Sequence, residues 1–318
     1  MVKKFMSMRL SIITINYNNA EGLRKTLASV AAQTYRDIEH IIVDGGSTDG
    51  SLEVIKEYVK KVESGESRVK SVIWSSEPDK GIYNAMNKGM EIALGRRIVN
   101  TDHTTSSNSL NVNRSTLNES LCDYIQILNS GDILASPDVT ERMMNALHHT
   151  SNITYQTSIS ILYGNMIKKD YATGKIIGKS KEVEYSLRQY YASTMNHDCC
   201  YIRRDLFDTY GLYDENLKIV SDWKWFLQTI GLGNVKPVYV DIDVTIFDAS
   251  GISESNLELR NKERRQVLED VMPPAILADY DKHFFDAEQM NRLRRHHFYW
   301  LVYFIERVLF KLEKWNVI

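Results

Sequence analysis

The stretch LSIITINYNNAEGLRKTLASVAAQTYRDIEHIIVDGGSTDG, residues 10–50, holds two apolar runs on either side of a segment with helical periodicity. The runs at 10–15 and 38–43 are rich in β-branched residues, which predicts two buried strands. Between them the apolar residues follow helical spacing, which predicts an amphipathic helix. Each run ends in a polar loop, NYNN after the first and DGGSTDG after the second. The order strand, helix, strand is that of a βαβ unit with parallel strands.

The same rhythm continues beyond residue 50. A strand is expected at 69–74, a helix at 81–94, and a further strand at 124–128 that ends in the loop NSGD. A hairpin at 159–180, a strand at 238–247 and helices from about residue 256 follow, with a break at Pro273-Pro274. In such sheets the ligand crevice lies at the carboxyl ends of the strands. The polar loops after the strands are therefore the first candidates for a binding site.

Composition excludes several classes of protein. The chain has 318 residues, 43% of them apolar and 25% charged, with a net charge of −2, which is typical of a globular protein and leaves no basic field for nucleic acid. Its three cysteines form neither a disulfide framework nor a CxxC pair, and no run of signal-peptide length precedes the first strand. These features predict a cytoplasmic location.

Acidic residues follow three of the expected strands, namely Asp44, Asp79 and Asp132. Carboxylates gathered at one edge of a sheet repel one another unless a cation or hydrogen-bond donors are shared among them. Their oxygens suit Mg²⁺ or Mn²⁺, which bridges protein oxygens to phosphates. The alternative for each loop alone is that Asp and Asn only form turns and helix caps.

Three strings taken together resemble family-2 inverting glycosyltransferases of bacterial polysaccharide biosynthesis: SIITINYNNAEGLRKTLASVAAQTY…IEHIIVDGGSTDGS, SEPDKGIYNAMNKGMEIALGR and YIQILNSGD. The resemblance covers about the first 140 residues. It implies a GT-A fold, which is an α/β fold with a Rossmann-like, mostly parallel central sheet flanked by helices. Segments around His197, Asp222 and FDASGIS resemble the acceptor side of the same family.

The resemblance implies a set of donor-binding residues. The loop that cradles the nucleoside in the family corresponds here to Thr14, Asn16, Tyr17 and Asn18. Asp44 matches the position that accepts a hydrogen bond from the base, and Asp79 and Lys80 match the next donor-binding segment, where a lysine can face the diphosphate. Each of these residues also has an ordinary structural alternative, such as a solvated surface lysine for Lys80.

The loop Asn129 to Asp132 resembles the metal-binding signature of the family, with one departure. Gly131 stands where many members have a second acid, so Asp132 is the remaining carboxylate and the expected ligand of Mn²⁺ or Mg²⁺. Waters and the donor diphosphate could complete the coordination of such an ion. Gly131 and Asp132 are counted with the donor-binding residues.

Asp222 matches the catalytic base of the family. An inverting transfer needs a carboxylate to take the proton of the acceptor hydroxyl as that oxygen attacks the anomeric carbon. The alternative role is a helix N-cap, which is compatible with a base. His197 is assigned to the acceptor side, where the alternative is a structural histidine.

The expected organisation is a glycosyltransferase domain over 1–250 and a helical extension over 251–318. The domain divides into a donor part at about 1–140 and an acceptor part at about 141–250, with a polar insertion at about 99–122. The aromatic-rich periodicity after residue 298, preceded by basic residues, fits peripheral contact with the inner face of the cytoplasmic membrane, or a helix packed on its own domain or on a second copy in a homodimer. Both interpretations stay open.

The function implied is transfer of a sugar from a nucleotide-sugar donor, first of all a UDP-sugar, to a polysaccharide or lipid-linked acceptor. Two alternatives remain. One is a catalytically silent nucleotide- or membrane-binding scaffold, favoured only by Gly131; the other is a sugar-phosphate nucleotidyltransferase, which would need a glycine-rich basic loop that residues 10–20 lack. No G-x-G-x-x-G follows the first strand, which argues against a dinucleotide-dependent dehydrogenase.

Overall fold

A computed structural model describes residues 8–97, 122–153, 159–170, 173–248, 256–295 and 299–314. The chain forms two compact units, Met1–Arg264 and Arg265–Ile318. The expected domain boundary after residue 250, the FDASGIS loop beyond Asp248 and nearly all of the polar insertion at 99–122 lie outside the described residues.

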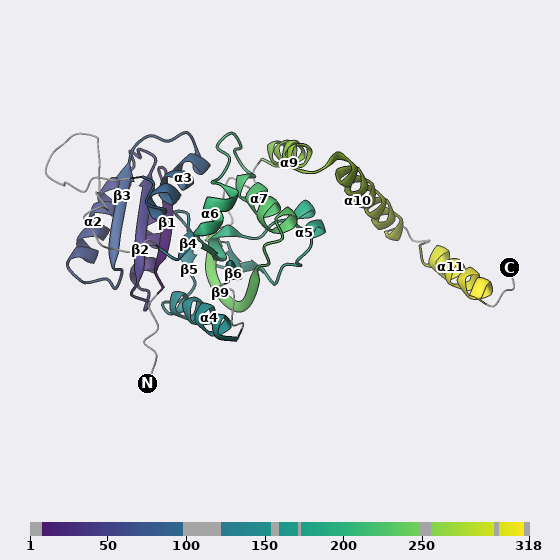
Figure 1. Ribbon diagram of the computed structural model, residues 1–318, viewed down its shortest axis with the longest axis horizontal. Coiled ribbons are helices and arrows are strands. Elements are labelled where there is room, and N and C mark those ends of the chain that lie inside the picture. Colours follow the sequence, from purple (N-terminus) through teal and green to yellow (C-terminus); the bar gives the residue numbers. More distant parts are fainter. Residues whose placement is uncertain are drawn as a thin grey trace. The chain divides into compact units, whose positions relative to one another are not determined.

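The first part of unit 1 is the parallel half of the sheet (Figure 1). Its strands follow the order β3-β2-β1-β4, and all three pairings are parallel, which confirms the βαβ prediction. The elements are β1 (Leu10–Asn16), α1 (Ala20–Ala31), β2 (Ile38–Asp44), α2 (Ser51–Glu63), β3 (Ser71–Ser76), α3 (Ile82–Ala93) and β4 (Tyr124–Ile127).

The second part of unit 1 extends the same sheet with strands of both directions. The order continues from β4 as β8-β6-β9-β5, with β7 paired to β6. Only β6 and β9 run parallel here, and the other pairings are antiparallel, so the sheet as a whole is mixed. The elements are β5 (Ile133–Leu134), α4 (Val139–Ile153), β6 (Ile161–Lys169), β7 (Ile176–Lys179), α5 (Leu187–Ala192), the 3₁₀ helix η2 (His197–Cys199), β8 (Cys200–Arg203), α6 (Asp205–Tyr210), α7 (Ser221–Phe226), the π-helix η3 (Leu227–Leu232) and β9 (Val238–Asp248).

Helices cover both faces of the parallel half, because alternate side chains of each strand point to opposite faces. Ile42 of β2 lies in one buried cluster with residues of α1 and α2. On the other face α3 approaches β1 so closely that a Cβ atom on Gly89 would lie 2.4 Å from Cγ2 of Ile13. The strands are therefore buried on both faces, and β1 and β2 are buried at every position.

The remaining helices are α9 (Leu257–Val271), α10 (Pro274–Arg294) and α11 (Tyr299–Lys314). The expected break at Pro273-Pro274 is confirmed, since α9 ends before it and α10 begins with Pro274. On α11 several large apolar side chains are exposed, among them Trp300, Phe304 and Phe310. No helix within the described ranges combines the length and the apolar character needed to cross a bilayer.

Candidate active site

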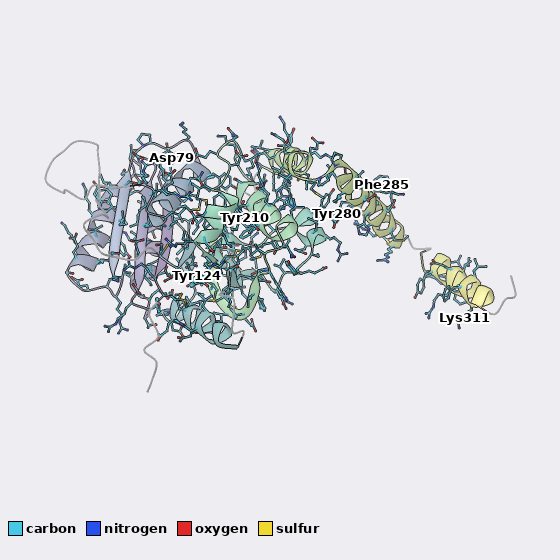
Figure 2. The ribbon with its side chains drawn as sticks, viewed as in Figure 1. Asp79, Tyr124, Tyr210, Tyr280, Phe285 and Lys311 are labelled. Carbon is cyan, nitrogen blue, oxygen red and sulfur yellow. The ribbon has the colours of Figure 1, made fainter. Side chains whose placement is uncertain are left out.

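The polar loops meet at the carboxyl edge of the parallel strands, as the βαβ pattern predicts. Figure 2 shows Asp79 at this edge, just beyond β3, and Tyr124, the first residue of β4, at the opposite edge. Asn16, Asp44 and Ser76 are register partners on adjacent strands, each the last residue of its strand. One row of strand ends therefore holds residues that lie far apart in the sequence.

Asp44 is completely buried and is the centre of a hydrogen-bond network. Its Oδ1 accepts from Asn16 Nδ2 at 2.8 Å and from Ser47 Oγ at 2.5 Å. Its Oδ2 accepts from Ser47 N at 2.9 Å and from Ser76 Oγ at 2.6 Å. Asp44 thus ties together β1, the loop after β2, and β3.

Asn18 joins the loops after β1 and β2. Its N–H donates to Ser47 Oγ and its Oδ1 accepts from Thr48 N, each at 2.8 Å. The residue has a φ of 47°, a left-handed conformation that asparagine tolerates. Tyr17, the neighbour of Asn18, is 66% exposed, so its ring is available to a ligand.

Tyr17 and Asp79 face each other across Gly45. A Cβ atom on Gly45 would lie 3.1 Å from Tyr17 Cδ2 and 2.5 Å from Asp79 Oδ2, so a side chain there would displace the Asp79 carboxylate. Lys80 follows and is exposed, with its N–H donating to Asn84 Oδ1 at 3.1 Å. Tyr17 and Asp79 therefore lie at one point of the edge, as the resemblance implies.

The expected loop placement of Thr14 and Asn16 is wrong. Both belong to β1, which runs to Asn16, and both are buried. The Thr14 hydroxyl lies 3.0 Å from His40 Nε2 inside the sheet, so it does not face a ligand. Polar residues inside a strand look like loop residues in a hydropathy pattern, and here they are buried because each has a polar partner on β2.

The loop Asn129–Asp132 follows β4 and is joined to α1. Gly131 has a φ of +107°, and its N–H donates to Thr26 Oγ1 at 2.9 Å. Thr26 Oγ1 in turn donates to the carbonyl of Asp132 at 2.7 Å. A side chain at Gly131 would be strained by this backbone conformation, so the missing second acid agrees with the local geometry.

Asp132 and Asn129 could hold a divalent cation. Asp132 lines a pocket and is 4% exposed. The Oδ1 atom of Asn129 is buried and has no hydrogen-bond partner within the described part of the chain. Oxygens of this kind fit Mg²⁺ or Mn²⁺. Within that same part, no group of three or more His, Cys, Asp or Glu side chains forms a metal site, so most of the coordination would come from the donor and from water.

Asp222 lies in α7 and is held through both of its carboxylate oxygens. Oδ1 accepts from the Tyr83 hydroxyl at 3.0 Å, and Oδ2 lies 3.1 Å from His197 Nδ1. The Asp222 and His197 side chains are each 18% exposed, so the pair is largely but not completely buried. Tyr83 comes from α3, 139 residues earlier in the chain, and it brings the two halves of the sheet together at this point.

The charges of Asp222 and His197 stabilise each other. Burial alone would raise the pKa of the Asp222 carboxyl, but the hydrogen bond and charge of His197, with smaller contributions from the Trp223 N–H and Tyr83, lower it below its usual value. Burial would lower the pKa of the His197 imidazole, but the bond to Asp222 and the acidic neighbours raise it. The pair therefore favours the charged form of each group, against the effect of burial.

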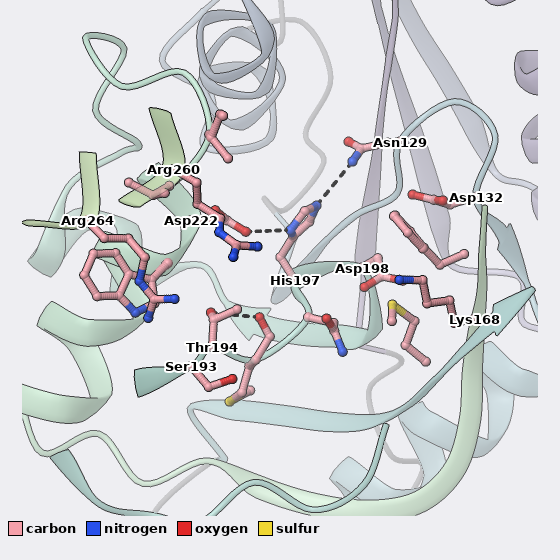
Figure 3. Close-up of a pocket in the computed structure, with 17 residues that line it drawn as sticks. Asn129, Asp132, Lys168, Ser193, Thr194, His197, Asp198, Asp222, Arg260 and Arg264 are labelled. Carbon is pink, nitrogen blue, oxygen red and sulfur yellow. Dashed lines mark hydrogen bonds and ion pairs between the residues drawn. The ribbon is translucent and has the colours of Figure 1, made fainter. Parts of the chain in front are cut away.

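His197 also connects Asp222 to the loop after β4. Its Nε2 lies 3.4 Å from the Asn129 side-chain amide (Figure 3). A protonated imidazole donates from both ring nitrogens, so Asn129 would then turn its oxygen toward Nε2. The same oxygen is the one that could bind a cation, and its two lone pairs allow it to face both partners.

The pocket has a volume of about 300 Å³ and contains the expected residues Asp132, His197 and Asp222. In Figure 3, Asp132 and Lys168 lie on one side of His197, and Asp222, Arg260 and Arg264 lie on the other. Sequence reasoning missed Tyr83, Lys168, Arg260 and Arg264. Arg260 and Arg264 are one helical turn apart, which was a visible signal, whereas nothing in the sequence joins Tyr83 to Asp222.

The arrangement can remove a proton from a hydroxyl group. The Asp222 carboxylate, with its lowered pKa, lines the pocket, and Asp132 lies beyond His197 (Figure 3). A nucleophile next to Asp222 could therefore attack a group held from the Asp132 side.

Comparison with known proteins finds similarity to glycosyltransferases. A sequence model of the family described as "Glycosyl transferase family 2" matches residues 11–103. The chain is similar to an uncharacterized glycosyltransferase of Mycobacterium tuberculosis, with 28% identity over 246 residues that cover 76% of each protein. It is also similar to a PGL/p-HBAD biosynthesis glycosyltransferase of Mycobacterium bovis, with 24% identity over 243 residues that cover 76% of this chain and 77% of the relative.

Two solved structures share the fold. S. aureus TarS 1-349 in complex with UDP aligns with a TM-score of 0.53 and 16% identity, covering 82% of this chain and 70% of that one. A mannosyltransferase from Pyrobaculum calidifontis in complex with GDP-Man and Mn²⁺ aligns with a TM-score of 0.50 and 15% identity, covering 82% of this chain and 61% of that one. The chain spans 43% of the longer TarS chain.

Proposed function

We propose that this chain, which is similar to family-2 glycosyltransferases and has the GT-A fold, transfers a sugar from a UDP-sugar, with inversion, to a saccharide or lipid-linked acceptor. The observation that carries the proposal is the position of Asp222, whose carboxyl pKa lies below its usual value, in the same pocket as Asp132 at the carboxyl edge of the parallel strands. A base and a donor site within one pocket are what a single displacement requires.

The donor assignment rests on the edge of the parallel strands. The exposed ring of Tyr17 offers a face for a base, and Asp79 offers an acceptor just beyond β3. Asp44 supports this edge from within, because it is buried and both of its oxygens already accept hydrogen bonds. The TarS structure contains UDP, and the mannosyltransferase structure contains GDP-Man. Both ligands are nucleoside diphosphates or their sugar derivatives, which supports this donor class for the chain.

The chemical step that we propose begins at Asp222. Its carboxylate takes the proton of the acceptor hydroxyl, and the oxygen attacks the anomeric carbon from the face opposite the diphosphate. The bond from that carbon to the diphosphate oxygen breaks, and the nucleoside diphosphate leaves with the electron pair. Tyr83 and His197 hold the carboxylate in position, since each occupies one of its oxygens.

Asp132 and Asn129 would hold a divalent ion in this proposal. When bound, such an ion neutralises the charge that develops on the leaving diphosphate. The Mn²⁺ in the mannosyltransferase structure supports a metal requirement, and we propose Mn²⁺ or Mg²⁺ for this chain.

The test is metal-dependent turnover of a panel of nucleotide sugars, with Asp222→Asn as the key variant. We expect the wild type to hydrolyse or transfer the sugar with Mn²⁺ or Mg²⁺. The rate of the variant should be lower by a factor of at least about one hundred. Asp208→Asn is the matched control, because Asp208 is exposed and pairs with Arg96 at the surface. Full activity of a folded Asp222→Asn protein would show that Asp222 is not the base.

We also propose that α11 brings the enzyme to the cytoplasmic face of a membrane. Its exposed aromatic side chains, and Arg292, Arg294 and Arg295 just before it, are a combination that suits an anionic lipid surface. A homodimer through α11 is the competing explanation.

A further inference from the structure

Arg260 and Arg264 form a pair of positive charges that the proposed chemistry does not use. They lie one turn apart on α9, so they share a face of the helix, and both line the pocket. Like charges at this spacing repel, and burial together with the charge of Arg260 lowers the pKa of Arg264. Such a pair costs stability unless an anion is shared between the two guanidinium groups.

No carboxylate of the described residues is shared between the two guanidinium groups, although the charge of Asp222 favours the charged form of Arg264 and partly offsets the effect of Arg260. Neither guanidinium forms an ion pair with a described carboxylate. Arg264 donates to the Tyr191 carbonyl at 3.1 Å and lies 4.3 Å from the ring centroid of Trp223. Both contacts hold its guanidinium in place without neutralising the charge.

Arg260 has a buried donor without an acceptor. Its Nε lies out of contact with solvent and makes no hydrogen bond to the described residues. An unsatisfied donor on a charged group is costly, and it is a sign of a missing ligand. Planar guanidinium groups match the oxygens of a phosphate, with two parallel hydrogen bonds from each group.

The position of the pair indicates which substrate would carry the phosphate. Trp223, under Arg264, directly follows the proposed base Asp222, whereas the donor diphosphate is assigned to the loop with Asp132. Figure 3 shows Asp132 on the far side of His197 from both arginines. A hydroxyl that reaches Asp222 belongs to the acceptor, so a group that reaches Arg260 and Arg264 beyond it belongs to the acceptor as well.

We propose that Arg260 and Arg264 bind a phosphate group of the acceptor, so that this enzyme glycosylates saccharides that carry a phosphate or are linked through one. The inference rests on the proposed function, because it takes the Asp222 side as the acceptor side. The phosphate that the arginines bind could instead belong to the donor diphosphate, and the experiment distinguishes these two origins.

The experiment uses inorganic phosphate as the probe and the full chain saturated with UDP and Mg²⁺. Phosphate binding is followed by broadening of its ³¹P resonance in the wild type and in Arg260→Gln, Arg264→Gln and Lys262→Gln. Lys262 is the matched control, since it is an exposed cation on the same helix between the two arginines. We expect phosphate to bind the wild type and Lys262→Gln beside UDP, and to bind each arginine variant at least about tenfold more weakly, as loss of a charged hydrogen-bond donor predicts.

Three outcomes would overturn the proposal. If UDP displaces the phosphate, the arginines bind the donor diphosphate. If phosphate binds the arginine variants as tightly as the wild type, its site lies elsewhere. If phosphate does not bind the wild type, there is no phosphate site. Failure of the proposed function has a different signature. In that case UDP does not bind and no nucleotide sugar is consumed, whatever the arginine variants do with phosphate.

Discussion

At the scale of single residues, the site depends on the pairing of Asp222 with His197. The ionised carboxylate is ready to accept a proton at neutral pH, but its lowered pKa makes it a weaker base. Tyr83 and His197 fix the direction of its lone pairs, and this orientation offsets the loss of basicity. His197 is thus a positioning residue that acts through Asp222.

Replacement of His197 by glutamine should move the pH profile of the enzyme. Without the imidazolium, burial dominates and the pKa of Asp222 rises, so the acid limb of kcat/KM shifts to higher pH. The loss of activity should therefore be greater at pH 6 than at pH 8. The profile of nucleotide-sugar turnover between pH 4.5 and 9 measures this.

His283→Gln on α10 is the control for that profile, because His283 is an exposed residue of the other compact unit. An acid limb that stays in place in His197→Gln, with only a uniform fall in rate, would mean that His197 has a structural role and does not tune the base.

At the scale of elements, the packing of α3 on β1 decides whether Tyr83 reaches Asp222. Gly89→Ala adds a methyl group 2.4 Å from Cγ2 of Ile13, which is completely buried and cannot swing away. Alanine raises helix propensity by about 1 kcal/mol, but overpacking a core costs about 1 to 3 kcal/mol. We expect a net loss of about 1 kcal/mol or more in the free energy of unfolding, measured by urea denaturation.

Gly178→Ala on β7 is the matched control, since a Cβ there meets only the Lys168 side chain at 3.8 Å. Equal stability of the two alanine variants would show that α3 can move away from β1 at little cost.

The exposed side of α11 makes a second prediction at this scale. The full chain should float with vesicles that contain an anionic phospholipid, and Trp300→Ser combined with Phe304→Ser should abolish flotation, because both side chains are more than half exposed. Glu306→Gln on the same helix should leave flotation unchanged. A chain that remains with the aqueous fraction and sediments as a dimer would favour the second copy as the partner of α11.

At the scale of the whole molecule, nucleotide binding should appear as stability. UDP with Mn²⁺ at a hundredfold excess over Kd should stabilise the chain by about 2.7 kcal/mol and raise its Tm, and EDTA should reverse most of the rise. Asp132→Asn should keep the Tm of the free chain and lose the metal-dependent part of the shift. A shift that EDTA leaves intact would contradict the metal site at Asp132.

The parallel half of the fold could be predicted because apolar segments alternate there with polar loops. Its strands are buried on both faces, so each one is a continuous apolar run in the sequence. The strand ends were less predictable. The apolar run stops at Ile15, yet β1 continues through Asn16, whose amide is buried against Asp44. A polar residue with a polar partner on the next strand extends a strand in a way that hydropathy does not show.

The structure brings together some of the predicted site residues and separates others. Asp132, His197 and Asp222 do line one pocket, whereas Thr14 lies inside the sheet. The contact of Tyr83 with Asp222 and the place of the arginines depend on how distant segments pack. Periodicity in a sequence reports which face of a helix is buried, but not which pocket that face adjoins.

The order of strands also has a consequence for how the chain folds during its synthesis on the ribosome. The hydrogen bond between Ser11 of β1 and Glu39 of β2 joins residues 28 positions apart in the sequence. The bond from Arg9 to Asp123, next to β4, joins residues 114 positions apart. Closing the longer loop costs more chain entropy and comes later in synthesis. We expect the nascent chain to pair β1 with β2 first. Asp132 and then Asp222 would reach their places only after the later segments emerge from the ribosome.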